Sequence, residues 1–160
     1  PYRVPFAIAS DHTISQAYPD MITHNTPDSQ YAVDIAMPVG TDVFAARGGV
    51  VFDVTAGNFK GGADAANMSL ANVVRILHDD GTYAIYAHLN GTSIRVRVGD
   101  VVERGEYSAD SGNTGSTSGP HLHFAGVRTI GRTMESVPVR FVGADSNPIA
   151  PATGRILTAY

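Results

Sequence analysis

The sequence predicts an all-β fold whose core is an antiparallel sheet. Short runs rich in Val, Ile, Tyr and Phe alternate with turn residues, among them 17 Gly and 9 Pro. No segment keeps a helical period of 3.6 residues over three turns. Hydrophobic residues make up 43% of the 160 residues and charged residues 16%, which excludes an intrinsically disordered chain. This length fits one domain, so we expect a single domain over 1–160.

Each expected strand is a β-rich run between turn signals. In chain order the expected strands are Tyr31–Ala36, Asp42–Ala45, Val50–Thr55, Asn72–His78, Thr82–Leu89, Ser93–Val98 and His121–Val127. Turns are expected at Pro38–Thr41, at Asp80-Gly81 in a type I′ hairpin, and at Asn90-Gly91. Gly57–Leu70 is small, polar and unpatterned, so it is either plain surface loop or the wall of a groove. The tail 146–160 contains two prolines and is expected to meander.

Several classes of protein are excluded by composition. The chain has no Cys, which rules out disulfide scaffolds, thiol nucleophiles and cysteine-built zinc sites. A net charge of −4 argues against a nucleic-acid partner, and no apolar run approaches the length of a transmembrane segment. The chain begins at Pro1 and shows no signal-peptide core, so we expect a trimmed mature form or an excised domain.

The most informative segment is Gly112–Phe124, which leads into His121-Leu122-His123. Successive side chains of a strand alternate between its faces, so the two histidines share one face and Leu122 takes the other. A metal ion with a neighbouring acid–base group is an economical explanation for two adjacent imidazoles. The alternative is a solvent-facing pair on an outer strand.

Further candidate residues come from three other segments. Asp34 lies between Val33 and Ile35 in an apolar strand, where an unpaired carboxylate is costly to bury. A cation would remove that cost, as would backbone amides or an arginine such as Arg47. His24 lies in a loop ten residues before Asp34. His88 ends an expected strand, and alternation places it on the face of Tyr86, which is therefore expected to line a groove. We assign His78 to hairpin structure and no role to His12.

Together these segments resemble the lysostaphin-type zinc metallopeptidases, which cut the peptides of bacterial peptidoglycan. The resemblance runs from about Thr23 to Ala125. It rests on five stretches: Tyr31–Ala46, Gly48–Val51, Asn72–Leu89, Val98–Gly105 and Ser111–Phe124. The last reads Ser-Gly-Asn-Thr-Gly-Ser-Thr-Ser-Gly-Pro-His-Leu-His-Phe. It implies an antiparallel β core with a substrate groove, similar to a duplicated hybrid motif, with the motifs at about 23–127. It also implies peptidoglycan peptides as partners and a periplasmic, cell-envelope or secreted location.

The resemblance implies one Zn²⁺ per chain, held by His24, Asp34 and His123, with His88 and His121 as catalytic residues that do not bind the metal. Many family members place the first ligand four residues before the aspartate, where this chain has Gln30. A subset resembling the staphylolytic and β-lytic proteases has a wider gap, which His24 fits. Gln30 and His12 remain the alternatives to His24 as the first ligand.

Three protein ligands leave a fourth position of tetrahedral zinc open, as in catalytic sites. No HExxH motif supplies a glutamate base, so we expect His88 and His121 to share the work. One accepts a proton from the attacking water, and the pair stabilises the oxyanion or protonates the leaving amine. The expected activity is hydrolysis of a peptide bond in peptidoglycan. The alternatives are an inactive domain of the same fold that binds peptidoglycan or an envelope protein, and an iron oxygenase or cupin-type barrel.

Overall fold

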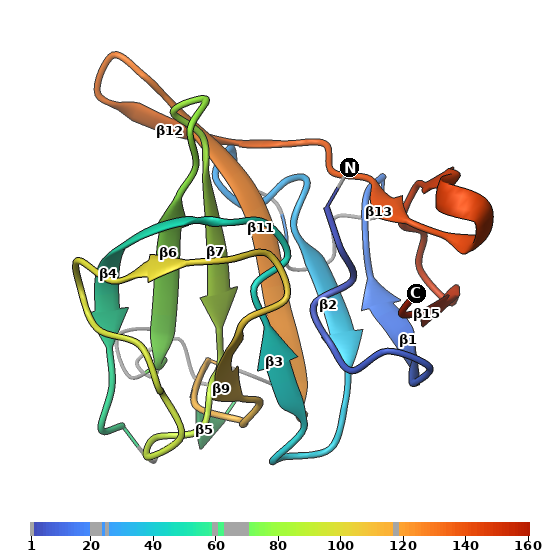
Figure 1. Ribbon diagram of the computed structural model, residues 1–160, viewed down its shortest axis with the longest axis horizontal. Helices are drawn as coiled ribbons and strands as arrows, with labels where there is room; N and C mark the ends of the chain where they lie inside the picture. Colours follow the sequence, from blue (N-terminus) through green and yellow to red (C-terminus); the bar gives the residue numbers. More distant parts are fainter. Residues whose placement is uncertain (1, 20–23, 25, 59–60, 63–70, 117–118) are drawn as a thin grey trace.

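A broad antiparallel sheet forms the centre of the molecule in a computed structural model that describes residues 2–19, 24, 26–58, 61–62, 71–116 and 119–160 (Figure 1). The strands are β1 (Asp11–Gln16), β2 (Val33–Ala36), β3 (Asp42–Phe44), β4 (Gly49–Thr55), β5 (Gly61–Gly62), β6 (Val73–Leu77), β7 (Tyr83–Ala87), β8 (Val101–Val102), β9 (Tyr107–Asp110), β10 (Gly115–Ser116), β11 (His121–Ile130), β12 (Thr133–Val137), β13 (Phe141–Val142), β14 (Pro148–Ile149) and β15 (Ile156–Thr158). Within these ranges the helical content is one 3-10 turn at Ala144–Ser146. The all-β, antiparallel prediction is confirmed.

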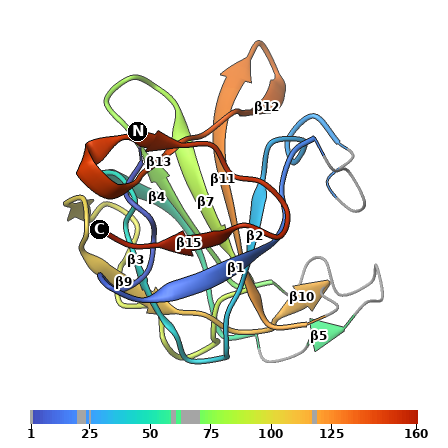
Figure 2. The ribbon, with the colours of Figure 1, turned by 90° about the vertical axis from the view of Figure 1, so that its right-hand side faces the viewer.

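The main sheet has nine strands among the described residues, in the order β15-β1-β2-β11-β7-β6-β4-β8, with β12 also paired to β11. Every pairing in it is antiparallel. The long strand β11 lies at its centre: its first half pairs with β2, its second half with β12, and β7 follows the other side. Figure 2 shows the short β5–β10 pair at one end of the sheet and β12 at the opposite end.

The two faces of the sheet differ in what covers them. The two-stranded sheet β3–β9 lies over one face (Figure 1), and the main hydrophobic core fills the space between. Leu122 and Phe124 point into this core and are fully buried. Alternation along β11 therefore turns His121 and His123 to the opposite face. That second face carries a smaller buried cluster around Tyr83 and Val127.

Six of the seven expected strands are present, with shorter or slightly shifted ends. The expected strand Ser93–Val98 is wrong, because this segment is assigned to no strand. The Arg95 N–H donates to the Ser108 carbonyl at 2.9 Å, but no ladder extends this bond within the described residues. A run of alternating apolar residues predicts burial of one side, and Val96 is indeed buried, but it does not guarantee a partner strand.

The tail 146–160 was expected to meander, and this prediction is wrong. It contains β14 and β15, and β15 pairs with β1 in the main sheet through Asp11↔Thr158 and Thr13↔Ile156. Leu157 is fully buried in the main core. The long-range pairing of β15 with the polar strand β1 carries no local sequence signal, since β1 has only one apolar residue, Ile14.

The β6–β7 hairpin is confirmed, but its turn is not type I′. A type I′ turn requires positive φ at both central residues, whereas only Gly81 has it here, with φ +83°. The His78 N–H donates to the Thr82 carbonyl at 2.8 Å, and the Gly81 N–H to the His78 carbonyl at 3.2 Å. The Asp80 carboxylate accepts hydrogen bonds from Thr82, which stabilises the longer turn. The turns expected at 38–41 and 90–91 are present. Most of the expected loop 57–70 lies outside the described residues.

Candidate metal centre

Three side chains from distant parts of the chain converge on one point. His24, Asp34 and His123 each offer a ligand atom, and these atoms all lie within 4.8 Å of one another. His24 Nε2 lies 3.0 Å from Asp34 Oδ2, and His123 Nδ1 lies 3.0 Å from Asp34 Oδ1. His24 and Asp34 are buried, and His123 is half-buried. Two imidazole nitrogens and one carboxylate form a donor set that suits a divalent transition metal.

Strand register explains how Asp34 and His123 meet. β2 and β11 are antiparallel with Asp34 directly opposite His123, and residues in such a pair share one face of the sheet. The next pair along, Val33 and Phe124, faces the core and is fully buried. A polar pair thus sits between apolar ones, and the core packing on the other face fixes its register.

Burial alone would raise the pKa of Asp34, but hydrogen bonds from His123 and His24, with the charges of His123 and His121, hold it well below its ordinary value. The carboxylate is therefore ionised at neutral pH. Gln16 adds a further contact, since its Nε2 donates to Asp34 Oδ2 at 3.2 Å. Gln16 reaches this face through a bulge in β1 between Ile14 and Gln16. The sequence analysis missed Gln16, because neither the strand nor the bulge has a local signature.

His88 reaches the same site by breaking strand alternation. Tyr86, two residues earlier in β7, is buried in the main core, and its hydroxyl accepts a hydrogen bond from the Ala46 N–H at 2.8 Å. The expectation that Tyr86 shares a face with His88 is therefore wrong. β7 ends at Ala87, and His88 has φ +63°, a left-handed conformation that costs on the order of 1–2 kcal/mol for a residue with a Cβ. This bend brings the His88 ring 4.6 Å from that of His121 and 5.9 Å from that of His123.

His88 and His121 are held in the same tautomer. His88 Nδ1 lies 2.6 Å from the Thr114 carbonyl, and His121 Nδ1 lies 2.8 Å from the Gly119 carbonyl. A carbonyl oxygen only accepts, so both Nδ1 atoms carry the proton and both Nε2 atoms keep a lone pair when the rings are neutral. Burial lowers the pKa of His88 to about 4, assisted by the charge of His121, so His88 is neutral at pH 7. His121 Nε2 lies 3.7 Å from Asp34 Oδ1.

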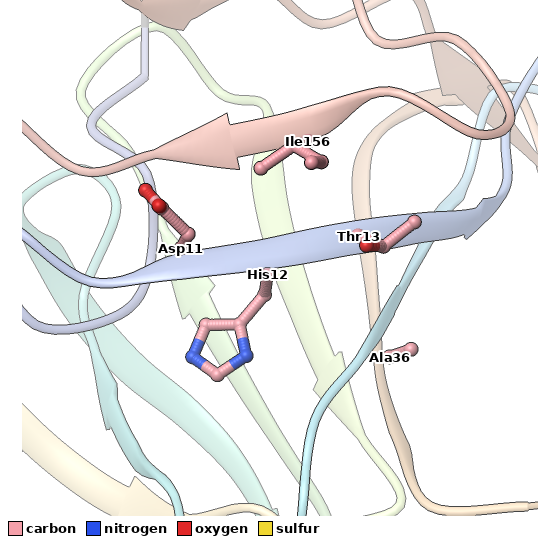
Figure 3. A pocket seen from close by; sticks show the side chains of 5 residues that line it. All are labelled: Asp11, His12, Thr13, Ala36 and Ile156. Carbon is pink, nitrogen blue, oxygen red and sulfur yellow. The ribbon is translucent and has the colours of Figure 1, made fainter.

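The other histidines and the alternative ligands lie elsewhere. His12 packs edge-on against Phe6 at a ring distance of 4.6 Å. It borders a pocket of about 310 Å³ between β1 and the end of β2 (Figure 3), lined by Asp11, His12, Thr13, Ala36 and Ile156. Gln30 lines a separate hollow of about 600 Å³ with residues of β11 and β12. His12 is not part of the His24–Asp34–His123 cluster, and none of these three residues lines the hollow beside Gln30.

Arg47 does not neutralise Asp34. It pairs instead with Asp79 and Asp80 at 2.7 and 3.1 Å. His78 belongs to the hairpin, as expected, and its Nδ1 donates to the Gly48 carbonyl at 2.8 Å.

The structure brings together all five residues that the sequence analysis named as metal ligands or catalytic residues. Within the described ranges no helix is long and apolar enough to cross a membrane.

Sequence comparison finds peptidases among the proteins similar to this chain. Residues 28–136 match the model of Peptidase family M23; His24 lies just outside this stretch. The peptidoglycan DD-endopeptidase ShyA of Vibrio cholerae is 34% identical over 115 residues, 72% of this chain and 24% of ShyA. Lysostaphin of Staphylococcus simulans is 35% identical over 95 residues, 59% of this chain and 17% of lysostaphin. The chain therefore spans about a quarter or less of the length of these relatives.

Solved structures give the same result. The catalytic domain of the prophage-encoded M23 protein EnpA from Enterococcus faecalis, an A109H mutant, superimposes with a TM-score of 0.60 at 25% identity, covering 83% of this chain and 92% of that one. Lysostaphin from Staphylococcus simulans gives a TM-score of 0.57 at 29% identity, covering 78% of this chain and 47% of that one. The oxygenase and cupin alternatives are therefore wrong. The family model covers well over half of the sequence, and the chain belongs to Peptidase family M23.

Proposed function

We propose that this chain is a zinc-dependent endopeptidase that hydrolyses peptide bonds in peptidoglycan. The observation that carries the proposal is the convergence of His24, Asp34 and His123, with two further imidazoles beside them. The names of its relatives support the substrate class, since ShyA is a peptidoglycan DD-endopeptidase and another relative, ALE-1 of Staphylococcus capitis, is a glycyl-glycine endopeptidase. Such a substrate implies action in the cell envelope or outside the cell.

The donor set fits zinc. Two imidazoles and one carboxylate, without a thiolate, are typical of catalytic zinc sites that keep a coordination position for a non-protein ligand. His24 would bind through Nε2 and His123 through Nδ1, because these are the atoms turned towards Asp34. The hydrogen bond from Gln16 orients the carboxylate, as outer partners of metal ligands commonly do. A bound cation would also offset the cost of burying the Asp34 carboxylate, and it would explain why two imidazole nitrogens are turned towards that carboxylate.

Bound zinc would polarise the scissile carbonyl and make a water molecule a better nucleophile. The protein supplies the proton transfers. The rings of His88 and His121 lie 4.6 Å apart, and the carbonyls of Thr114 and Gly119 fix them through Nδ1. One imidazole accepts the proton of the attacking water. The pair then stabilises the oxyanion or returns a proton to the leaving amine.

Single alanine substitutions separate the two groups of residues. We expect His24→Ala, Asp34→Ala and His123→Ala to lower both zinc content and the cleavage of purified peptidoglycan. His88→Ala and His121→Ala should retain about one zinc per chain and lose about 10²–10⁴-fold in rate. Metal analysis and mass spectrometry of released fragments measure the two properties.

Three outcomes would contradict the proposal. Full zinc content in His24→Ala would reject His24 as the first ligand. Full activity in His88→Ala or His121→Ala would remove that residue from the mechanism. Binding of peptidoglycan without any chelator-sensitive cleavage would identify an inactive binding domain of the same fold.

A further inference from the structure

The left-handed bend at His88 determines which face of the sheet its imidazole reaches. In an extended chain His88 would follow Tyr86 towards the core. With φ +63° it lies instead beside His121 on the metal-site face. A residue with a Cβ leaves this conformation unless its surroundings hold it there. Some structure around His88 and the following residue, Leu89, must therefore maintain the bend.

Two buried polar side chains bind the backbone of Leu89. Its carbonyl accepts hydrogen bonds from Asn72 Nδ2 at 3.0 Å and from the Thr114 hydroxyl at 2.9 Å. Its N–H donates to the Asn72 carbonyl at 3.1 Å. Asn72 and Leu89 are fully buried and Thr114 is 6% exposed. Removing one of these side chains would therefore leave its partner group buried without a hydrogen bond from water.

Asn72 and Thr114 also hold each other. The Thr114 hydroxyl accepts the Asn72 N–H at 3.1 Å, so it both receives and gives a hydrogen bond. The remaining amide groups of Asn72 bind the backbone of Asn58, with Nδ2 donating to its carbonyl at 2.8 Å and Oδ1 accepting its N–H at 3.0 Å. Every polar side-chain atom of Asn72 and Thr114 thus has a hydrogen-bond partner, which favours a single arrangement.

We propose that Asn72 and Thr114 are positioning residues for His88: their side chains maintain the bend, and the Thr114 carbonyl sets the ring so that Nε2 faces the metal site. One residue thus contributes twice, since its hydroxyl fixes the Leu89 peptide and its carbonyl receives His88 Nδ1–H. The assignment to catalysis rests on the proposed hydrolase function, whereas the positioning itself does not.

Thr114→Val tests the proposal, because it keeps the shape of the side chain and removes the hydroxyl; Thr114→Ser is the matched control, because it restores the hydroxyl. In the zinc-loaded protein we expect Thr114→Val to lower kcat about 10- to 100-fold with KM and zinc content unchanged, and Thr114→Ser to recover most of the loss. In a His88→Ala background Thr114→Val should cause no further loss, because both changes act on the same group.

Nitrogen NMR of the histidine rings provides a readout that is independent of activity. Wild type and Thr114→Ser, with or without zinc, should show His88 protonated on Nδ1 in one conformation, and Thr114→Val should show mixed tautomers or ring exchange. Equal kcat losses in Thr114→Val with and without His88, or an unchanged His88 spectrum in Thr114→Val, would overturn the proposal. If Thr114→Val does not fold, a wild-type His88 protonated on Nε2 would overturn it equally. A protein with the expected spectra and no hydrolase activity would contradict the proposed function alone.

Discussion

His78 is a buried histidine that lies outside the catalytic cluster. Its side chain is buried, the ring of Tyr2 lies 5.8 Å away, and among the described residues its Nε2 has no hydrogen-bond partner. Burial lowers the pKa of His78 below its ordinary value of 6.5, opposed by the hydrogen bond to Gly48 and assisted by the charge of Arg47. Folding therefore favours the neutral imidazole.

The sign of the resulting pH dependence follows from proton binding. Below about pH 6.5 the unfolded state binds a proton that folded His78 resists, so this contribution to stability is complete above pH 6.5 and is lost as the pH falls towards the folded pKa. His78→Asn keeps a donor for the Gly48 carbonyl and cannot titrate. We expect the free energy of unfolding, measured by urea denaturation from pH 7.5 to 5, to fall less steeply in His78→Asn than in wild type. Equal slopes would show that His78 does not resist protonation.

For individual residues, the sequence predicted which side chains come together at the site, but not the backbone conformation that brings each of them there. Alternation correctly placed His121 and His123 together, because both lie within one regular strand. It failed for His88, because the left-handed bend lies just beyond the end of β7. Gln16 could not be found at all, since its contact with Asp34 depends on a bulge between two strands distant in sequence. The chemical roles of all these residues stay predictions.

The first residue of β4, Gly49, lies unusually close to the backbone of the neighbouring strand β6. A Cβ added to Gly49 would lie 2.0 Å from the Leu77 carbonyl oxygen, which belongs to the neighbouring strand β6. The β4–β6 register cannot admit a side chain there without moving the backbone. We expect Gly49→Ala to lower the free energy of unfolding by at least about 2 kcal/mol, measured by chemical denaturation.

Gly119→Ala is the control for this prediction. Among the described residues nothing lies within 4 Å of a Cβ added there, and the φ of Gly119 is not positive. We expect its free energy of unfolding to stay close to that of wild type. Equal stability of Gly49→Ala and Gly119→Ala would mean that β4 adapts without loss.

Strands with strong local patterns were predictable, and strands fixed by distant partners were not. β6, β7 and β11 are rich in Val, Ile, Tyr and Phe or alternate clearly, and each was expected within a few residues of its observed ends. β15, near the end of the chain, pairs with β1, near its beginning, and β1 pairs on its other side with β2. A single sequence contains no direct signal for such a pairing.

Across the whole molecule, one buried cluster joins residues from Val4 to Ala159. The single domain over 1–160 stays a prediction. Zinc would stabilise the folded protein, because His24, Asp34 and His123 lie close together only in the folded state. At zinc 100-fold above its Kd the gain is about 2.7 kcal/mol, or roughly 5–10 °C in Tm for a chain of this size.

A chelator should therefore lower the Tm by about that amount, and added zinc should restore it. Calorimetry and circular dichroism should report one coincident transition in both states. Asp34→Asn serves as the control and should lose most of its response to the chelator. A chelator-independent Tm in wild type would contradict a zinc site, and two separate transitions would contradict the single domain.

The pairing of β15 with β1 has a consequence for aggregation. β1 lies beside β2, the strand that carries Asp34, and β15 covers its outer edge. Proteolytic loss of the last few residues would expose unpaired backbone groups on β1, the strand directly beside the one that carries Asp34. Such an edge is a template for adding a strand from another molecule. β15 is itself an edge strand, but it has only three residues whereas β1 has six, so the intact chain presents a shorter edge than the truncated chain would.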